Sequence, residues 1–132
     1  MTPQEFETEV RKLRQLQRRF FRCKKDDPDR KKALSMMSEK EKELFPYIDT
    51  VLAIRPEGEA HSEREQFFLL VADMVKKQSD WRRRGGGASW AMYKAKEAES
   101  MVDKWLAKWD ERKAEEKQRA TEAEKAKQTR LF

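Results

Sequence analysis

The sequence predicts an all-α protein: two α-hairpins packed as a small four-helix bundle, with an extended charged C-terminal helix or tail. Three observations lead to this fold class. Apolar residues recur at helical spacing in four separate segments. Four glycines and four prolines leave little room for the many turns of an all-β fold. Charged residues make up 42% and apolar residues 37% of the 132 residues, which allows only a narrow core.

We expect the first helix to begin at Pro3 and to run to about Cys23. Thr2 is a suitable cap, proline is favoured at the first helical position, and Glu5 completes a capping box. The apolar residues that follow share one face, and a glutamine takes the remaining position on it: Phe6, Val10, Leu13, Gln17 and Phe20.

The second helix is expected to begin at Asp27-Pro28, after the polar stretch "KKDDPDRKK", and to end at Arg55-Pro56. Pro46 falls inside this pattern and should kink or shorten the helix, because proline lacks a backbone N–H. The residues expected on its buried face are Leu34, Met37, Leu44, Ile48 and Leu52.

Residues 55–62 are expected to link the hairpins. Ser62 and Glu65 form a second capping box, and a third helix should run from there to Arg84, where "GGG" ends it. Its apolar residues are Phe67, Val71, Met74 and Trp81.

A fourth helix should begin near Ser89. Its apolar residues are Trp90, Tyr93, Met101, Val102, Trp105, Leu106 and Trp109. The bundle is therefore expected to span residues 1–109, with hairpins at about 3–54 and 63–109. Residues 110–132 have no comparable apolar face, so this segment is either an exposed helix held by charge pairs or a frayed tail.

The two halves of the chain resemble each other, which predicts an internal duplication. An offset of 61 residues aligns Phe6 with Phe67 and Gln17 with Gln78 in the first helix of each half. An offset of 54 aligns Asp49 with Asp103 in the second. The alternative is that any two amphipathic helices align under a heptad comparison.

Each half also resembles short α-hairpin proteins that bacterial phages and prophages encode. In the first half the resemblance lies in "VRKLRQLQRRFF" and "SEKEKELFPYIDTVL", and in the second half in "VADMVKKQSDW" and "AKEAESMVDKWL". It covers residues 6–109. It implies a helical fold and an origin in a phage or another mobile element, and it brings no catalytic residue with it.

Charge and cysteine content point to the compartment and the class of partner. The net charge of +6 favours an anionic partner such as nucleic acid or an acidic protein. The single Cys23 fits a reducing cytoplasm, which the phage resemblance implies is that of a bacterial host cell. The first residues lack the basic and apolar regions of a signal peptide, and no apolar run approaches the length of a membrane span, so we expect no membrane association.

The sequence offers little for catalysis, so we expect a protein that is not an enzyme and uses no cofactor and no metal. His61 is the only histidine and falls in the linker. Cys23 lies among basic residues, but without a nearby histidine it reads as an ordinary thiol. One histidine and one cysteine exclude the usual zinc ligand sets.

Two basic features are candidate phosphate contacts. Arg11, Arg14, Arg18 and Arg22 form one stripe of the first helix, which either follows a nucleic-acid backbone or is an ordinary solvated face. No aromatic residue is interleaved with this stripe, so base stacking is not indicated there. In "WRRRGGGASW", residues Arg82, Arg83 and Arg84 precede a glycine run and a helix start, a combination that can hold a phosphate. A basic helix end stopped by glycines is the favoured reading.

Most aromatic residues fall on the predicted buried face and are expected to pack in the core. Phe21 lies beside that face, and Trp109 lies past the expected end of the bundle. Either residue is a candidate exposed anchor for a partner.

The sequence "KAKQTRLF" places two large apolar residues after a strongly polar segment. Its last five residues resemble the peptide that docks in the bacterial sliding clamp. The resemblance implies that Gln128 forms hydrogen bonds in a small pocket while Leu131 and Phe132 fill an apolar cleft. Thr129 and Arg130 depart from the residues preferred at those positions, which implies weaker docking.

Together these features lead us to expect a phage or mobile-element binding protein, tethered to the sliding clamp and acting near DNA replication or repair, with non-specific electrostatic affinity for DNA. The alternative is a phage interaction protein that inhibits a host factor or forms part of a virion, without clamp binding.

Overall fold

The computed structural model describes residues 1–55, 58 and 62–130. Within these residues the chain forms four helices and no strand, which confirms the predicted all-α class. The helices are α1 (Pro3–Arg22), α2 (Pro28–Ile54), α3 (Glu63–Arg83) and α4 (Trp90–Arg130). No helix in this described part is long and apolar enough to cross a membrane.

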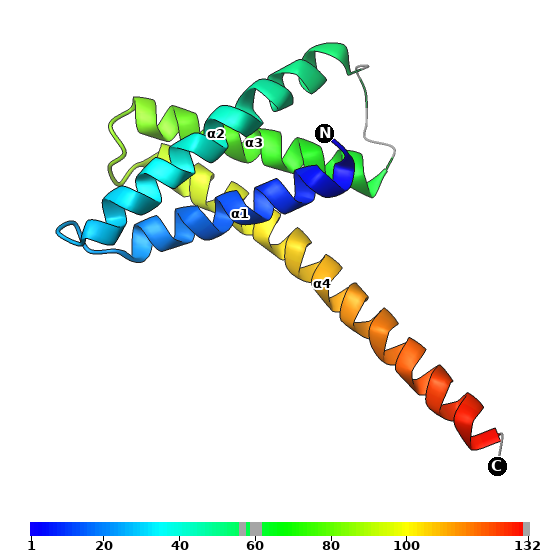
Figure 1. The fold of residues 1–132 in the computed structure, drawn as a ribbon. Coiled ribbons are helices and arrows are strands. Elements are labelled where there is room, and N and C mark those ends of the chain that lie inside the picture. Colours follow the sequence, from blue (N-terminus) through cyan, green and yellow to red (C-terminus); the bar gives the residue numbers. More distant parts are fainter. Residues whose placement is uncertain (56–57, 59–61, 131–132) are drawn as a thin grey trace.

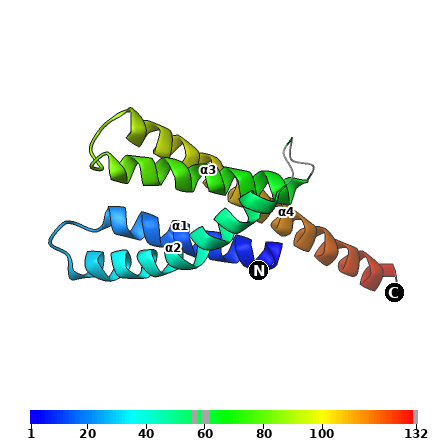
Figure 2. The same cartoon turned by 90° about the horizontal axis from the view of Figure 1, so that it is seen from above.

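The four helices form two antiparallel hairpins that pack side by side (Figures 1 and 2). Most backbone proximity lies within the hairpins, between α1 and α2 and between α3 and α4. The hairpins meet mainly through side chains. The second half of α4 continues beyond the other three helices and projects from the bundle (Figure 1).

The predicted caps fix where three helices begin. The hydroxyl of Thr2 accepts a hydrogen bond from the Glu5 amide at 3.1 Å, and the Ser62 hydroxyl does the same for Glu65 at 3.1 Å. The carboxylate of Asp27 accepts from the Asp29 amide at 2.9 Å. Each of these side chains satisfies a backbone donor that has no partner inside the helix.

Pro46 does not end α2, which continues for eight further residues to Ile54. The helix changes direction along its second half (Figure 2), as expected where proline removes one backbone hydrogen bond. This bend carries the last turns of α2 across the start of α3.

The core is one cluster that draws residues from all four helices. Aromatic rings dominate the end at which α1 and α3 begin: Phe6 lies 6.0 Å from Phe67 and 5.2 Å from Phe68, and Trp109 lies 4.8 Å from Phe67, centroid to centroid. The smaller apolar residues that complete the core include Val10, Leu13, Leu44, Ile48, Val71, Met74, Ala98, Val102 and Leu106.

The prediction of burial was wrong at two positions of α2. Leu34 and Leu52 are 43% and 42% exposed, whereas Ala33 is fully buried. One residue turns a helix by about 100°, so the burial of Ala33 moves its neighbour away from the core.

The aromatic assignments of α4 also need correction. Trp90 and Tyr93, expected among the apolar residues of the fourth helix, are 68% and 55% exposed. Trp109, a candidate exposed anchor, is buried against Phe67. Phe21, the other candidate, is 49% exposed. The packed part of α4 therefore begins about one turn after the start of the helix, and it includes Trp109.

Equivalent positions of the two predicted repeats face each other across the interface between the two hairpins. Phe6 meets Phe67, and Gln17 exchanges hydrogen bonds with Gln78, each pair at the offset of 61 residues. A duplicated hairpin packed about a two-fold axis would produce such self-facing pairs. The duplication itself stays a prediction.

Candidate functional site

The predicted basic stripe of α1 contains a residue that belongs to the interior. Arg14 is only 4% exposed. Its Nε and Nη2 donate to the two carboxylate oxygens of Asp103 at 2.8 Å, and its Nη1 donates to Gln17 Oε1 at 2.6 Å. This paired and buried guanidinium cannot also contact a phosphate, which corrects the expectation for Arg14.

The Arg14 contacts continue into a buried polar network between the hairpins. Gln17 and Gln78 each donate to the other's Oε1 at 3.1 Å, and Gln78 Nε2 also donates to Glu99 Oε1 at 2.9 Å. All three residues are buried. In a low-dielectric interior such a network holds only when its members are satisfied, so it fixes how the hairpins align.

The other three stripe residues differ in how far their charge is neutralised. Arg11 pairs with Glu7 at 3.0 Å and with Asp110 at 2.9 Å, and Arg18 lies 3.3 Å from Asp103. Arg22 is exposed and forms no ion pair within the described residues. The stripe is therefore mostly a set of links between α1 and α4, and Arg18 and Arg22 are the members that remain accessible.

Glu7 joins α1, α3 and α4 at one point. Its carboxylate lies 3.0 Å from Arg11, 2.9 Å from Arg64 and 3.6 Å from Lys113. Burial would raise the pKa of Glu7, but the hydrogen bonds from Arg11 and Arg64 and the nearby charges hold it below its ordinary value. Glu7 is thus a charged structural residue and not a proton donor at neutral pH.

The "WRRRGGG" stretch is the end of α3, as the favoured reading expected. The Gly86 amide donates to the Trp81 carbonyl at 3.0 Å and the Gly85 amide to the Arg82 carbonyl at 3.1 Å. This pattern is a Schellman motif, and it requires the positive φ of 97° that Gly85 adopts. The Trp81 indole N–H donates to the Gly87 carbonyl at 2.9 Å and fixes the loop.

The three arginines of this stretch are placed differently. Arg82 forms two hydrogen bonds with Glu41, at 2.9 and 2.6 Å, and so links α3 to α2. Arg83 and Arg84 share the carboxylate of Asp80 at 3.0 and 3.2 Å. Hydrogen bonding from Arg83, with the charge of Arg84, lowers the pKa of Asp80. Arg83 and Arg84 stay largely exposed, with one carboxylate between them.

Exposed aromatic rings lie at the start of α4, at the same end of the α3–α4 hairpin as these arginines. Trp90 and Tyr93 stack with their ring centroids 5.2 Å apart and their planes 17° from parallel. The Lys94 ammonium lies 5.6 Å from the centre of the Trp90 ring. Sequence reasoning missed this pair because aromatic residues at helical spacing usually pack inward.

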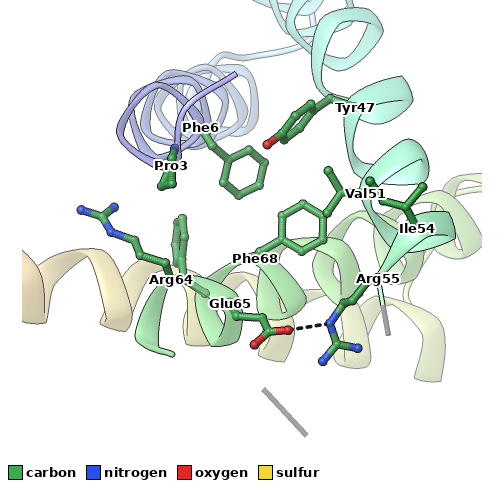
Figure 3. Close-up of a pocket in the computed structure, with 10 residues that line it drawn as sticks. Pro3, Phe6, Tyr47, Val51, Ile54, Arg55, Arg64, Glu65 and Phe68 are labelled. Atoms are coloured by element: carbon green, nitrogen blue, oxygen red, sulfur yellow. Dashed lines mark hydrogen bonds and ion pairs between the residues drawn. The ribbon is translucent and has the colours of Figure 1, made fainter. Parts of the chain in front are cut away.

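A pocket of 390 Å³ opens between the first turn of α1, the last turns of α2 and the start of α3. Figure 3 shows the rings of Phe6, Tyr47 and Phe68 around it, and the ion pair of Arg55 with Glu65 at one edge. Its lining is mostly apolar and contains no acid–base pair suited to catalysis. It fits an apolar group of a ligand or partner.

Of the two possibilities that the sequence left open for this segment, an exposed helix or a frayed tail, the structure has the exposed helix as far as Arg130. Residues 110–127 are exposed except for half-buried Arg112, whose Nη1 donates to both carboxylate oxygens of Glu63 at 2.9 Å. Gln128 belongs to the last turn of α4. Leu131 and Phe132 lie outside the described residues.

Of the two residues weighed for catalysis, only Cys23 lies within the described part of the chain. Cys23 is half-buried at the end of α1, and His61 lies outside the described residues. Across residues 1–55, 58 and 62–130, no three histidine, cysteine or carboxylate side chains gather where they could hold a metal ion.

Comparisons of the chain with protein-family models, with curated proteins and with solved structures found no match.

Proposed function

We propose that this chain is a non-enzymatic binding protein that docks on the bacterial DNA sliding clamp through residues 128–132 and acts near DNA replication or repair. The observation that carries the proposal is the projecting part of α4, in which residues 110–127 contribute almost nothing to the core. A helix this long without a buried face has no evident role in folding. The projecting helix would have a role if it presented a short binding peptide away from the bundle.

The dimensions of the projecting helix suit this role. Its 21 residues (110–130 of α4) span about 30 Å at 1.5 Å per residue. Opposite charges recur three and four residues apart along it, as with Glu115 and Arg119, and such pairs support a helix that nothing else covers. A semi-rigid spacer keeps the bundle clear of a large partner while the peptide is bound.

The chemistry of the peptide follows from the resemblance stated above. The Gln128 side-chain amide would form hydrogen bonds in a desolvated pocket, and the side chains of Leu131 and Phe132 would supply the apolar anchors. Thr129 and Arg130 occupy the variable positions and lower the expected affinity. The excess of basic residues would add weak electrostatic attraction to the DNA that passes through the clamp.

A second candidate function is a phage protein that inhibits a host factor or joins a virion. The pocket in Figure 3 favours it, because Ile54 at its edge is 77% exposed beside aromatic walls and would gain from contact with an apolar partner. This candidate requires no clamp binding, so the clamp experiment separates the two.

The experiment is a binding titration of the intact protein with the sliding clamp of a bacterial host. We expect the double substitution Leu131→Ala with Phe132→Ala to abolish binding. The matched control replaces the two variable positions, Thr129→Ala with Arg130→Ala, and should retain it. Equal binding by all three proteins, or no binding by the intact one, would refute clamp docking.

A further inference from the structure

The start of α4 displays aromatic surface that the fold does not use. A tryptophan that is 68% exposed, stacked on a tyrosine that is 55% exposed, is unusual for a bundle that buries its other tryptophans wholly or in large part. Exposed aromatic side chains of this kind are common where a partner binds.

The geometry of the pair resembles one step of an offset base stack. The planes of Trp90 and Tyr93 lie 17° from parallel, with centroids 5.2 Å apart. Their spacing of three residues along α4 holds them on one side of its first turn. Both residues are more than half exposed, so another flat ring can approach the pair.

The surrounding charge is strongly positive. Residues 82–96 contain five basic residues and no carboxylate. Arg83 and Arg84 share the single carboxylate of Asp80 and keep 77% and 68% of their side-chain surface exposed. Lys94 makes no ion pair with any described residue. The loop end of the α3–α4 hairpin therefore carries an excess of accessible cations, and the Lys94 ammonium lies 5.6 Å from the centre of the Trp90 ring.

We infer that Trp90 and Tyr93, with Arg83, Arg84 and Lys94, form a binding site for single-stranded nucleic acid at the loop end of the α3–α4 hairpin. Bases would stack on the two rings while the cations contact backbone phosphates. Every base has a flat aromatic face, so binding is indifferent to sequence. The inference does not rest on clamp docking.

The composition of the site decides between this ligand and the other classes that a basic, aromatic surface can bind. Residues 82–96 contain no leucine, isoleucine, valine or phenylalanine. Such a surface offers too little apolar area to insert into a membrane or to form a large protein interface. Duplex DNA keeps its bases stacked on one another, so it would use the cations and not the rings.

The site lies at one end of α4, and residues 128–130 lie at the other (Figure 1). A helix of 41 residues measures about 60 Å. If clamp docking also holds, one helix connects a clamp-bound peptide to a single strand of DNA well away from it.

The test uses the full chain and a fluorescently labelled single strand of about 15 thymidines, followed by fluorescence anisotropy. Replacing both Trp90 and Tyr93 with alanine should weaken binding at least about tenfold, given the contribution of one to two stacked bases. Replacing both with phenylalanine keeps a stacking ring at each position and should restore most of the affinity. Both residues are exposed, and an unchanged unfolding midpoint checks that each variant folds.

A second set of variants tests the proposed phosphate contacts. Arg83→Gln, Arg84→Gln and Lys94→Gln together should weaken binding and flatten its dependence on salt. Lys117→Gln with Arg119→Gln, which removes two exposed charges from the projecting part of α4, far from the site along that helix, should change the affinity less than twofold. The Leu131→Ala, Phe132→Ala protein should bind the strand normally, which separates this site from the clamp peptide.

Four results would overturn the inference: no binding of the single strand, equal loss of affinity for single strand and duplex in the alanine variant, an alanine variant that binds as the original protein does, or failure of phenylalanine to restore affinity. Binding to phosphatidylglycerol vesicles that depends on Trp90 and Tyr93, without binding to the single strand, would assign the surface to a membrane instead.

Discussion

Replacing Gln17 with leucine tests whether the buried polar network aligns the two hairpins. The Gln17 amide gives and receives one hydrogen bond with Gln78 and accepts a third from Arg14. Leucine has a similar volume but no polar atoms. The substitution therefore leaves Gln78 Oε1 and one Arg14 N–H without their partners in a buried site.

The expected loss follows from those two groups. A buried polar group left unpaired costs about 1–3 kcal/mol, and the added apolar burial returns about 1 kcal/mol. We expect Gln17→Leu to lower the free energy of unfolding by about 2–4 kcal/mol. Gln78→Leu should cost somewhat less, since Glu99 keeps Lys96 at 3.4 Å.

The double variant should behave differently from the sum of the two. With both amides replaced, the two leucines contact each other, and the groups left over are Arg14 and Glu99, already 3.8 Å apart and able to pair. The double variant should lose no more stability than the worse single variant, which gives a coupling energy of about 2 kcal/mol.

Urea denaturation of the four proteins, followed by circular dichroism, measures this cycle. Gln15→Leu, an exposed glutamine of the same helix, is the matched control and should change stability by less than about 0.5 kcal/mol. Additive losses in the double variant would refute the reasoning, because they would mean that the two amides stabilise the fold independently.

Three further predictions test the fold and its electrostatics. Because Glu7 has a lowered pKa in the folded protein, its contribution to stability should be present above its ordinary value of 4.5 and lost as the pH falls through the folded value; Glu7→Gln should flatten the pH dependence of urea unfolding there, and an unaltered profile would contradict this. Trp109→Ala should lower the free energy of unfolding by about 3–5 kcal/mol, since the ring packs on Phe67 and lies 4.6 Å from the Arg64 guanidinium; a loss below about 1 kcal/mol would show an exposed ring. Deleting residues 114–132 should leave the thermal midpoint within about 2 °C while helical ellipticity falls, and a larger drop would mean that this segment packs on the bundle.

The helix ends could be read from the sequence because their determinants are local. Thr2, Asp27 and Ser62 cap helices through hydrogen bonds that span three residues or fewer, and the glycines at 85–87 supply a backbone conformation that other residues avoid. These signals do not depend on how the hairpins pack.

The burial of individual side chains was harder to predict, because it depends on which other helix packs against a given turn. Trp109 packs on Phe67 and Arg64 near the start of α3, whereas the ring that stacks on Trp90 is the exposed Tyr93, so two similar residues on one helix differ in exposure. The burial of Arg14 depends on Asp103, which lies 89 residues away. The matched glutamines at positions 17 and 78 were the one sequence signal of that network, since polar residues on two apolar faces satisfy each other only when they meet.

The most direct measurement of clamp docking is a competition experiment. The intact protein is titrated with the bacterial sliding clamp, once alone and once with the clamp saturated by a synthetic "KAKQTRLF" peptide. Our account predicts binding in the first titration and its complete loss in the second, because one peptide-binding cleft serves both. Binding that survives saturating peptide, or no binding in either titration, would contradict it.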